Sequence, residues 1–164
     1  MKTIEQCFFE SELKSMKNKH YLKIYSEVFK RIEKRPITIV EVGILNGGSL
    51  EMWARYFGKH AHVIGIDSRV PEAAIEFFEE KRNSLDFARV TMVEGDAGDE
   101  SFWREFYLNN TGIDILIDDG GHSNKQQIVT LRAAIDNLAP FGLYICEDVA
   151  ASFMVDFGNP SKWS

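Results

Sequence analysis

Two short apolar runs in the C-terminal half of the chain each end in a pair of adjacent carboxylates. The first run is rich in β-branched residues and leads into Asp118 and Asp119, and the second leads into Glu147 and Asp148. Such runs predict strands buried on both faces, and an open α/β sheet binds its ligands where parallel strands end. If the two strands are neighbours, one carboxylate of each pair converges on a small volume. Carboxylates that close repel one another, and a hard divalent cation is the usual compensation.

A histidine accompanies the first of these pairs. His122 follows Asp119 by three residues, in a loop that enters a predicted helix. An imidazole with an ordinary pKa of about 6.5, placed beside a cation-filled carboxylate cluster, is suited to accept a proton. The alternative is a capping or surface histidine near a helix start, and the residues alone leave both interpretations open.

A glycine-rich turn follows the first predicted strand and opens a helix. Its pattern is Glu41, Gly43, Gly47 and Gly48, which differs from the G-x-G-x-x-G fingerprint of dinucleotide-binding proteins. The glycines let a ligand lie against the backbone, and the helix N-terminus offers free N–H groups. An acidic Glu41 suits a cationic ligand, such as a sulfonium with an amino-acid tail. The alternative is a turn that serves only strand–helix packing.

Two further aspartates follow the next two predicted strands. Asp67 comes about 20 residues after the glycine turn, where a carboxylate can accept both hydroxyls of a ribose. Asp96 stands in the corresponding place after the third strand and could reach an adenine edge. A turn or capping role is the alternative for both residues.

Strands alternate with helices throughout the chain after an N-terminal helical segment. Apolar spacings of three and four predict helix over 3–34, with a break at 18–20 and an end before Pro36. The predicted strands are 37–43, 62–67, 90–96, 113–117 and 142–146. The predicted helices are 50–57 with Ser49 as N-cap, 71–85, 100–108 and 125–138. This alternation predicts a doubly wound, mostly parallel sheet. The domain would comprise a helical segment, 1–35, and an α/β core, 36–164.

Composition limits the classes of protein to consider. The 164 residues, 45% of them hydrophobic, fit one globular domain, and a net charge of −6 argues against nucleic acid as a partner. The sequence contains neither an apolar stretch of about 18 residues nor a recognisable signal peptide, so no membrane association is expected. Cys7 and Cys146 lie far apart and form no metal-like spacing, which favours a reduced, cytoplasmic protein.

Together these motifs resemble class I S-adenosylmethionine-dependent methyltransferases. Within that class they resemble the magnesium-dependent macrolide-sugar O-methyltransferases and the related cephalosporin hydroxylases, over roughly residues 18 to 158. The residues that carry the resemblance are Glu41, Gly43, Gly47, Gly48, Ser49, Asp67, Gly95, Asp96, 117–122 and 144–148. By position, the resemblance implies a metal bound by Asp119, Glu147 and Asp148, and His122 as the catalytic base. It also implies cofactor contacts at Glu41, Gly43, Asp67 and Asp96.

The implied activity is methylation of a hydroxyl on a sugar-like or other small polyol natural product. The implied cofactors are S-adenosylmethionine and Mg²⁺ or another divalent cation. Two other hypotheses stay open: a non-catalytic nucleoside-binding module, and an oxygenase that uses iron at the same carboxylates. The family's sheet has seven strands, the last two forming an antiparallel edge, whereas five are predicted here. We therefore expect the C-terminal edge strands to be missing, and the uncovered edge predicts a homo-oligomer.

Overall fold

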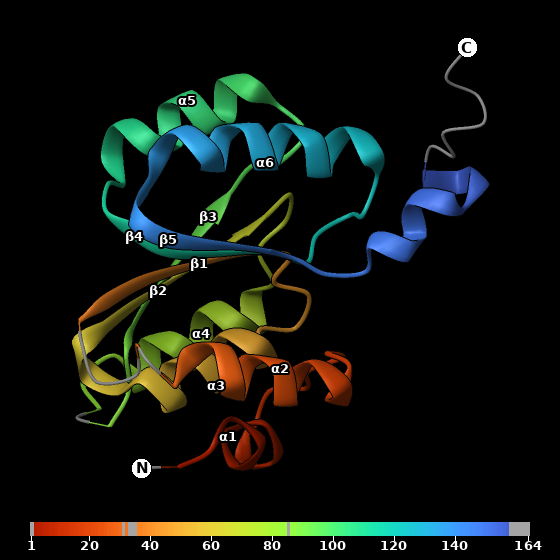
Figure 1. The fold of residues 1–164 in the computed structure, drawn as a ribbon. Helices are drawn as coiled ribbons and strands as arrows, with labels where there is room; N and C mark the ends of the chain where they lie inside the picture. Colours follow the sequence, from red (N-terminus) through yellow and green to blue (C-terminus); the bar gives the residue numbers. More distant parts are fainter. Residues whose placement is uncertain (1, 31, 33–35, 85, 158–164) are drawn as a thin grey trace.

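Five parallel strands form a single sheet at the centre of the molecule (Figure 1). The computed structural model describes residues 2–30, 32, 36–84 and 86–157. The strands are β1 (Ile37–Val42), β2 (Ala61–Asp67), β3 (Arg89–Glu94), β4 (Ile113–Asp118) and β5 (Leu138–Cys146). Their order is β3-β2-β1-β4-β5, so the chain starts in the middle of the sheet and winds outward in both directions. The predicted doubly wound parallel sheet is confirmed.

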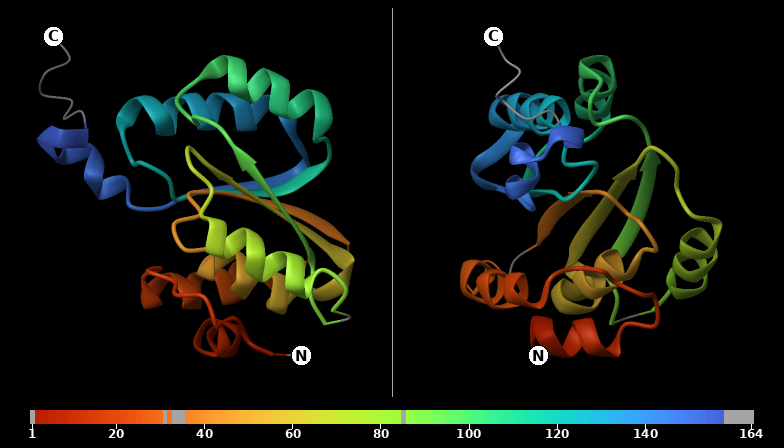
Figure 2. Two further views of the ribbon diagram at one scale, coloured as in Figure 1. Left: turned by 180° about the vertical axis from the view of Figure 1, so that it is seen from behind. Right: turned by 90° about the vertical axis from the view of Figure 1, so that its right-hand side faces the viewer.

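Helices cover both faces of this sheet, as Figures 1 and 2 show. One face carries α5 (Glu100–Asn109) and α6 (Asn124–Asn137). The other face carries α1 (Ile4–Glu10), α2 (Lys19–Phe29), α3 (Gly48–Phe57) and α4 (Glu72–Lys81). Short 3₁₀ helices follow α3 and β5: η1 (Gly58–His60), η2 (Val149–Phe153) and η3 (Val155–Phe157). Each face therefore has its own apolar core, separated from the other by the sheet.

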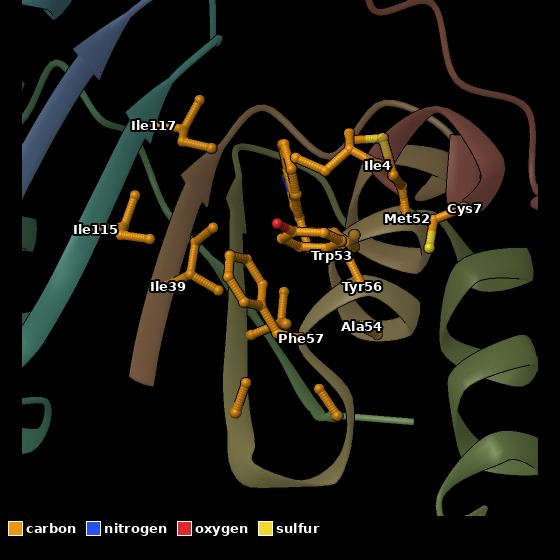
Figure 3. Packing of buried hydrophobic residues seen from close by; sticks show 14 of the residues in the cluster. Ile4, Cys7, Ile39, Met52, Trp53, Ala54, Tyr56, Phe57, Ile115 and Ile117 are labelled. Carbon is orange, nitrogen blue, oxygen red and sulfur yellow. The ribbon is translucent and has the colours of Figure 1, made fainter. Parts of the chain in front are cut away.

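The larger core ties the N-terminal helices to the sheet. Tyr25 and Phe29 of α2 pack on Trp53 of α3, with ring centroids 4.9 and 5.7 Å from the indole. Figure 3 shows Trp53 among aliphatic side chains of the strands and of α1. Buried aromatic rings of this size dominate core energetics. The N-terminal helices therefore pack against the core, and this matters because α2 lies close to the carboxylates described below.

The segment between α1 and α2 is fixed across the start of α3. Glu51, which is fully buried, accepts a hydrogen bond from the Leu13 N–H at 2.8 Å and pairs with Arg55 at 2.7 Å. A Cβ at Gly48 would lie 2.5 Å from the Lys14 carbonyl carbon, so this backbone crossing requires glycine. The crossing determines where the next residues of the segment lie.

Several predicted boundaries were wrong. Helix α3 begins at Gly48 with Gly47 as its N-cap, whose left-handed φ of 85° favours glycine, so Ser49 lies inside the helix. The break between α1 and α2 covers 11–18, and Asn18 caps α2 by accepting from the His20 N–H. Helix α4 ends at Lys81, before the predicted end at 85, a residue outside the described part of the chain.

Strand β5 begins four residues before the predicted start. Its register against β4 jumps from Ile113 opposite Leu138 to Ile115 opposite Leu143, so extra residues bulge out between them. The bulge lies between Leu138 and Leu143, mostly before the predicted start of the strand. Among residues 2–157, with the gaps given above, no strand follows β5, as expected for missing edge strands. No helix of the described residues is long and apolar enough to span a bilayer.

Candidate active site

The ends of β4 and β5 lie side by side, as the sequence predicts. Asp118 is paired with Cys146 in the ladder, so the residues that follow, Asp119 and Glu147, leave the sheet next to each other. Backbone hydrogen bonds fix both turns: the Glu147 N–H donates to the Asp118 carbonyl at 2.9 Å, and the Asp119 N–H donates to the Val42 carbonyl at 3.0 Å. The expected convergence of carboxylates from two strands is confirmed.

A lysine from the N-terminal segment lies among these carboxylates. The Nζ of Lys17 is 2.5 Å from Glu147 Oε1, 2.8 Å from Asp119 Oδ2 and 3.0 Å from Glu41 Oε1. Burial alone would lower the pKa of Lys17, but the charges of Glu41, Glu147 and Asp119 outweigh it and raise the pKa. The group is therefore a protonated ammonium with carboxylates on three sides.

Two tyrosines of α2 complete the contacts. The Tyr25 hydroxyl donates to Glu147 Oε1, and the Tyr21 hydroxyl donates to Asp148 Oδ1 at 2.8 Å. Burial raises the pKa of Glu147 to about 7, against the opposing charge of Lys17. Burial also raises the pKa of Tyr25, so its phenol remains a hydrogen-bond donor. Helix α2 thereby orients both carboxylates that follow β5.

Asp118 faces away from this cluster. The residue is 2% exposed, and its carboxylate accepts a hydrogen bond from the Tyr144 hydroxyl at 2.7 Å. Burial raises the pKa of Asp118, opposed by hydrogen bonds from Tyr144 and from the Gly120 backbone. Adjacent residues of a strand point to opposite faces, which separates Asp118 from Asp119.

His122 borders the same cavity without a close partner. Its Nε2 lies 3.8 Å from Asp148 Oδ2 and 4.0 Å from Asp119 Oδ1, and its buried Nδ1 has no hydrogen-bond partner among the described residues. Three residues around the cavity, which encloses about 360 Å³, have a left-handed backbone: Leu45 (φ 49°), His122 (φ 54°) and Asp148 (φ 51°). Such backbone strain gathers at functional sites and is retained where surrounding structure enforces it.

A second cavity, of about 270 Å³, lies on the side of β1 and β2. Gly43, Asp67, Gly95, Gly120 and Gly121 are among its lining residues. A Cβ at Gly43 would lie 2.2 Å from the Asp119 carbonyl oxygen, so the turn after β1 touches the turn after β4. The loop 119–122 therefore borders both cavities. The glycine turn and the carboxylate cluster lie on its two sides.

The predicted cofactor residues differ in their surroundings. Asp67 borders this second cavity, and its Oδ2 accepts from the backbone N–H groups of Ile44 at 2.8 Å and Leu45 at 3.4 Å. Asp96 is exposed and its Oδ1 accepts from the Gly98 N–H at 2.7 Å. Glu41 is fully buried, and its carboxylate faces Lys17. Of these three residues, Asp67 is the one that borders the cavity beside the glycine turn, where a cofactor ribose is expected.

The metal-ligand candidates form two groups. Asp119, His122 and Asp148 each offer a ligand atom within 4.8 Å of the others, and so do Asp119, Glu41 and Glu147. The three residues predicted to bind a metal are thus divided between the groups, with Asp119 common to both. Hard carboxylate oxygens are the ligands that Mg²⁺ prefers, and four carboxylates outnumber the single Lys17 ammonium. The donor set and its excess negative charge therefore fit a divalent cation.

Lys17 and Tyr25 were missed by the sequence analysis. Lys17 stands in a segment with several lysines, a pattern typical of a solvent-exposed surface. The available signal was Glu41, a carboxylate in the middle of an apolar strand, because a buried charge requires a partner. That signal predicts a cation nearby without saying which one.

Comparison with known proteins identifies relatives over most of this chain, although no family model matches. The chain is 31% identical to an 8-demethyl-8-alpha-L-rhamnosyl tetracenomycin-C 2'-O-methyltransferase of Streptomyces olivaceus, over 84% of this chain and 35% of the relative. It is 28% identical to demethylmacrocin O-methyltransferase of Streptomyces fradiae, over 84% of this chain and 33% of the relative. The chain thus spans about a third of the length of the curated relatives it matches.

Solved structures with a similar fold are also methyltransferases. The MycE methyltransferase of the mycinamycin biosynthetic pathway, in complex with Mg, SAH and mycinamycin VI, superposes with a TM-score of 0.73 at 25% identity. The match covers 84% of this chain and 36% of that protein. Both relatives are named as O-methyltransferases, one of them of a rhamnosyl tetracenomycin, and the fold of this chain is the Rossmann-like fold of class I S-adenosylmethionine-dependent methyltransferases.

Proposed function

We propose that this chain is the S-adenosylmethionine-binding core of a divalent-metal-dependent O-methyltransferase that acts on a hydroxyl of a sugar-like or small polyol natural product. The observation that carries the proposal is the convergence of Asp119, Glu147, Asp148 and His122 on one cavity, directly behind the glycine turn. The named activities of the relatives support the same reaction and the same class of acceptor.

The cofactor would lie over the turn from Gly43 to Gly48, with its ribose at Asp67. Asp67 holds the Ile44 N–H at 2.8 Å, whereas its contacts with Leu45, Ser68 and Arg69 are longer, at 3.2–3.4 Å. A carboxylate has about four lone-pair sites, so ribose hydroxyls would replace these longer contacts. Glu41 and Asp96 remain proposed cofactor positions on the resemblance alone. The cavity lined by Gly43, Asp67 and Gly95 provides the space on this side of the sheet.

The metal would be held by Asp119, Glu147 and Asp148. When bound, a divalent cation lowers the pKa of a coordinated hydroxyl and so makes an alcohol a better nucleophile near neutral pH. The strand ends and α2 already hold the three carboxylates at one edge of a shared cavity, which also reaches His122.

His122 would take the proton of the acceptor hydroxyl at Nε2. Lys17 cannot serve as this base, because the carboxylates around it raise its pKa and keep it protonated. The oxygen then forms a bond to the methyl carbon while the carbon–sulfur bond breaks, and the sulfonium becomes a neutral sulfide. This displacement requires the acceptor oxygen to lie in line with the methyl carbon, about 3 Å away, so the two bound molecules would meet at the edge of the loop 119–122, which borders both cavities.

Methyl transfer from labelled S-adenosylmethionine to glycosylated acceptors of the kinds named for the relatives tests the proposal. We expect turnover with Mg²⁺ and its loss with a chelator. His122→Ala should lower turnover by about 10²–10⁴-fold and leave the affinity for Mg²⁺, measured by calorimetry, unchanged. Cofactor binding without turnover on any acceptor would instead support the nucleoside-binding hypothesis. Turnover that requires iron and oxygen would support the oxygenase.

We also propose a homo-oligomer in the cytoplasm. In the described residues β5 pairs with β4 alone, and Phe141 in its bulge is 99% exposed. An open apolar strand edge favours association with another chain. The thiols of Cys7 and Cys146 are both free, in keeping with a reducing compartment. Light scattering should give a mass above 18.8 kDa, and a well-behaved monomer would contradict the proposal.

A further inference from the structure

Lys17 reaches the carboxylate cluster from far away in the sequence. Its partners Asp119 and Glu147 are 102 and 130 residues distant, and its side chain is 1% exposed. Removing an ammonium from water is costly, and only close opposite charges with good geometry offset that cost. The crossing over Gly48 places the lysine, so contacts within the chain hold this cation in position.

The ammonium of Lys17 is enclosed by carboxylates. It donates hydrogen bonds to Asp119 and Glu147, and Glu41 Oε1 lies 3.0 Å from Nζ as an ion pair. With 1% of the side chain exposed, the ammonium is not accessible to a substrate. Lys17 therefore acts by holding these carboxylates in position.

These carboxylates outline two cation positions that share Asp119. The inner position is bounded by Glu41, Asp119 and Glu147, and Lys17 fills it. The outer position is bounded by Asp119, His122 and Asp148. Lys17 contacts Oδ2 of Asp119, whereas Oδ1 of the same carboxylate lies toward His122. Asp119 thus faces the inner position with Oδ2 and the outer position with Oδ1.

We propose that Lys17 is a positioning residue, a built-in cation that fills the inner position and confines the divalent metal to the outer one. By holding one oxygen each of Asp119 and Glu147, it leaves their other oxygens and Asp148 for the metal. This inference rests on the proposed function for the outer site only. The inner site is already defined by contacts within the chain.

The test replaces the ammonium and asks whether a metal ion takes its place. In Lys17→Met, three carboxylates face one another without a cation. With a chelator present, the melting temperature of the variant should therefore be lower than that of wild type. Mg²⁺ should then raise its melting temperature by about 4 °C or more beyond the rise in wild type. Mn²⁺ counted by electron paramagnetic resonance should increase from one to two ions per chain.

Two variants control this measurement. Lys23→Met removes an exposed lysine of α2 and should match wild type in both measurements. Lys17→Arg retains a charge and should restore the wild-type response to Mg²⁺ and the count of one Mn²⁺. If Lys17→Met gains neither extra stabilisation nor a second ion, Lys17 does not occupy a cation position and the inference is overturned.

A structure of the wild-type protein with Mn²⁺ decides the matter if Lys17→Met does not fold. We expect anomalous scattering from an ion about 2.1 Å from oxygens of Asp119 and Asp148, with Lys17 still between Glu41 and Glu147. An ion that displaces Lys17 would overturn the inference and leave the proposed function standing. A wild type that binds no metal, beside a Lys17→Met variant that does, would overturn the proposed metal role and the outer position, and would support only the part of the inference that places Lys17 in a cation position.

Discussion

The two halves of the sheet's carboxyl edge hold their acidic residues in different ways. On the β1–β2 side, Asp67 and Asp96 accept from backbone N–H groups of nearby loops. On the β4–β5 side, Asp119 and Glu147 depend on the side chains of Lys17 and Tyr25, more than 100 residues earlier in the chain. The first half is built from local turn chemistry, the second from tertiary contacts.

This difference indicates how the negative charge is compensated in each half. A carboxylate that accepts from backbone N–H groups has its hydrogen-bond partners in the turn itself, whether or not a cofactor is present. A cluster of buried carboxylates is unstable without a compensating cation, so the molecule supplies one ammonium and leaves the remaining negative charge for a ligand. The metal half should therefore respond more strongly to changes of charge than the cofactor half.

The largest expected effect comes from Asp119→Asn. Loss of outer-shell partners usually weakens metal binding by about 10–100-fold, so loss of a ligand shared by two cation positions should cost at least about 100-fold. Metal affinity by calorimetry and turnover should fall together. The adjacent Asp118→Asn is the matched control, because that side chain faces Tyr144, and its metal affinity should change by less than about twofold. Equal losses in both variants would contradict the division between the two faces of β4.

A smaller effect is expected on the cofactor side. Asp67→Ala should weaken binding of S-adenosylhomocysteine by at least about tenfold, since hydrogen bonds to a charged group contribute about 1.5–3 kcal/mol. It should leave metal affinity unchanged, which tests whether the two halves are separate. Asp99→Ala is the control for lost turn contacts: Asp99 caps α5 by accepting from the Ser101 N–H at 2.8 Å. Asp99→Ala should lose some stability and bind the cofactor as wild type does. If folded Asp67→Ala binds S-adenosylhomocysteine with unchanged affinity, the assignment of Asp67 to the ribose is refuted.

The part of this architecture that follows from local rules could be predicted. Alternation of apolar runs and helical spacings indicated five strands, their parallel direction and the meeting of one carboxylate from each of the two pairs. Errors fell where a single residue's backbone decides the boundary, as at Gly47, whose left-handed φ starts α3 at Gly48, ahead of the predicted Ser49 cap. The β5 bulge was missed for a similar reason, since register depends on pairing with β4.

The site could be predicted only as far as neighbouring strands determine it. Asp119, His122, Glu147 and Asp148 border one cavity because two adjacent strands end there. Lys17 could not be placed, because its position depends on how α1 and α2 pack on α3 and on the backbone crossing at Gly48. No periodicity in the sequence reports such a long-range contact. The division of the carboxylates into two cation positions follows from that contact and was therefore missed.

The smallest expected effect separates a buried carboxylate from an exposed one by its dependence on pH. Burial raises the pKa of Asp118 in the folded chain above its ordinary value of about 3.9, so the folded chain holds the proton more tightly than the unfolded chain. Its contribution to stability is then full below the unfolded pKa and is lost as pH rises through the folded pKa, by about 1.4 kcal/mol for each pH unit that separates the two pKa values. Asp118→Asn can still accept from Tyr144 and has no such loss, so its stability relative to wild type should rise between pH 4 and 8. Asp99 has the opposite sign: hydrogen bonds from Ser101 lower its pKa, so its contribution to stability is present above about pH 4 and is lost as pH falls below that value, where wild type should lose stability relative to Asp99→Asn. Urea unfolding of the three proteins at several pH values measures both trends, and parallel curves would show that burial at β4 carries no electrostatic cost.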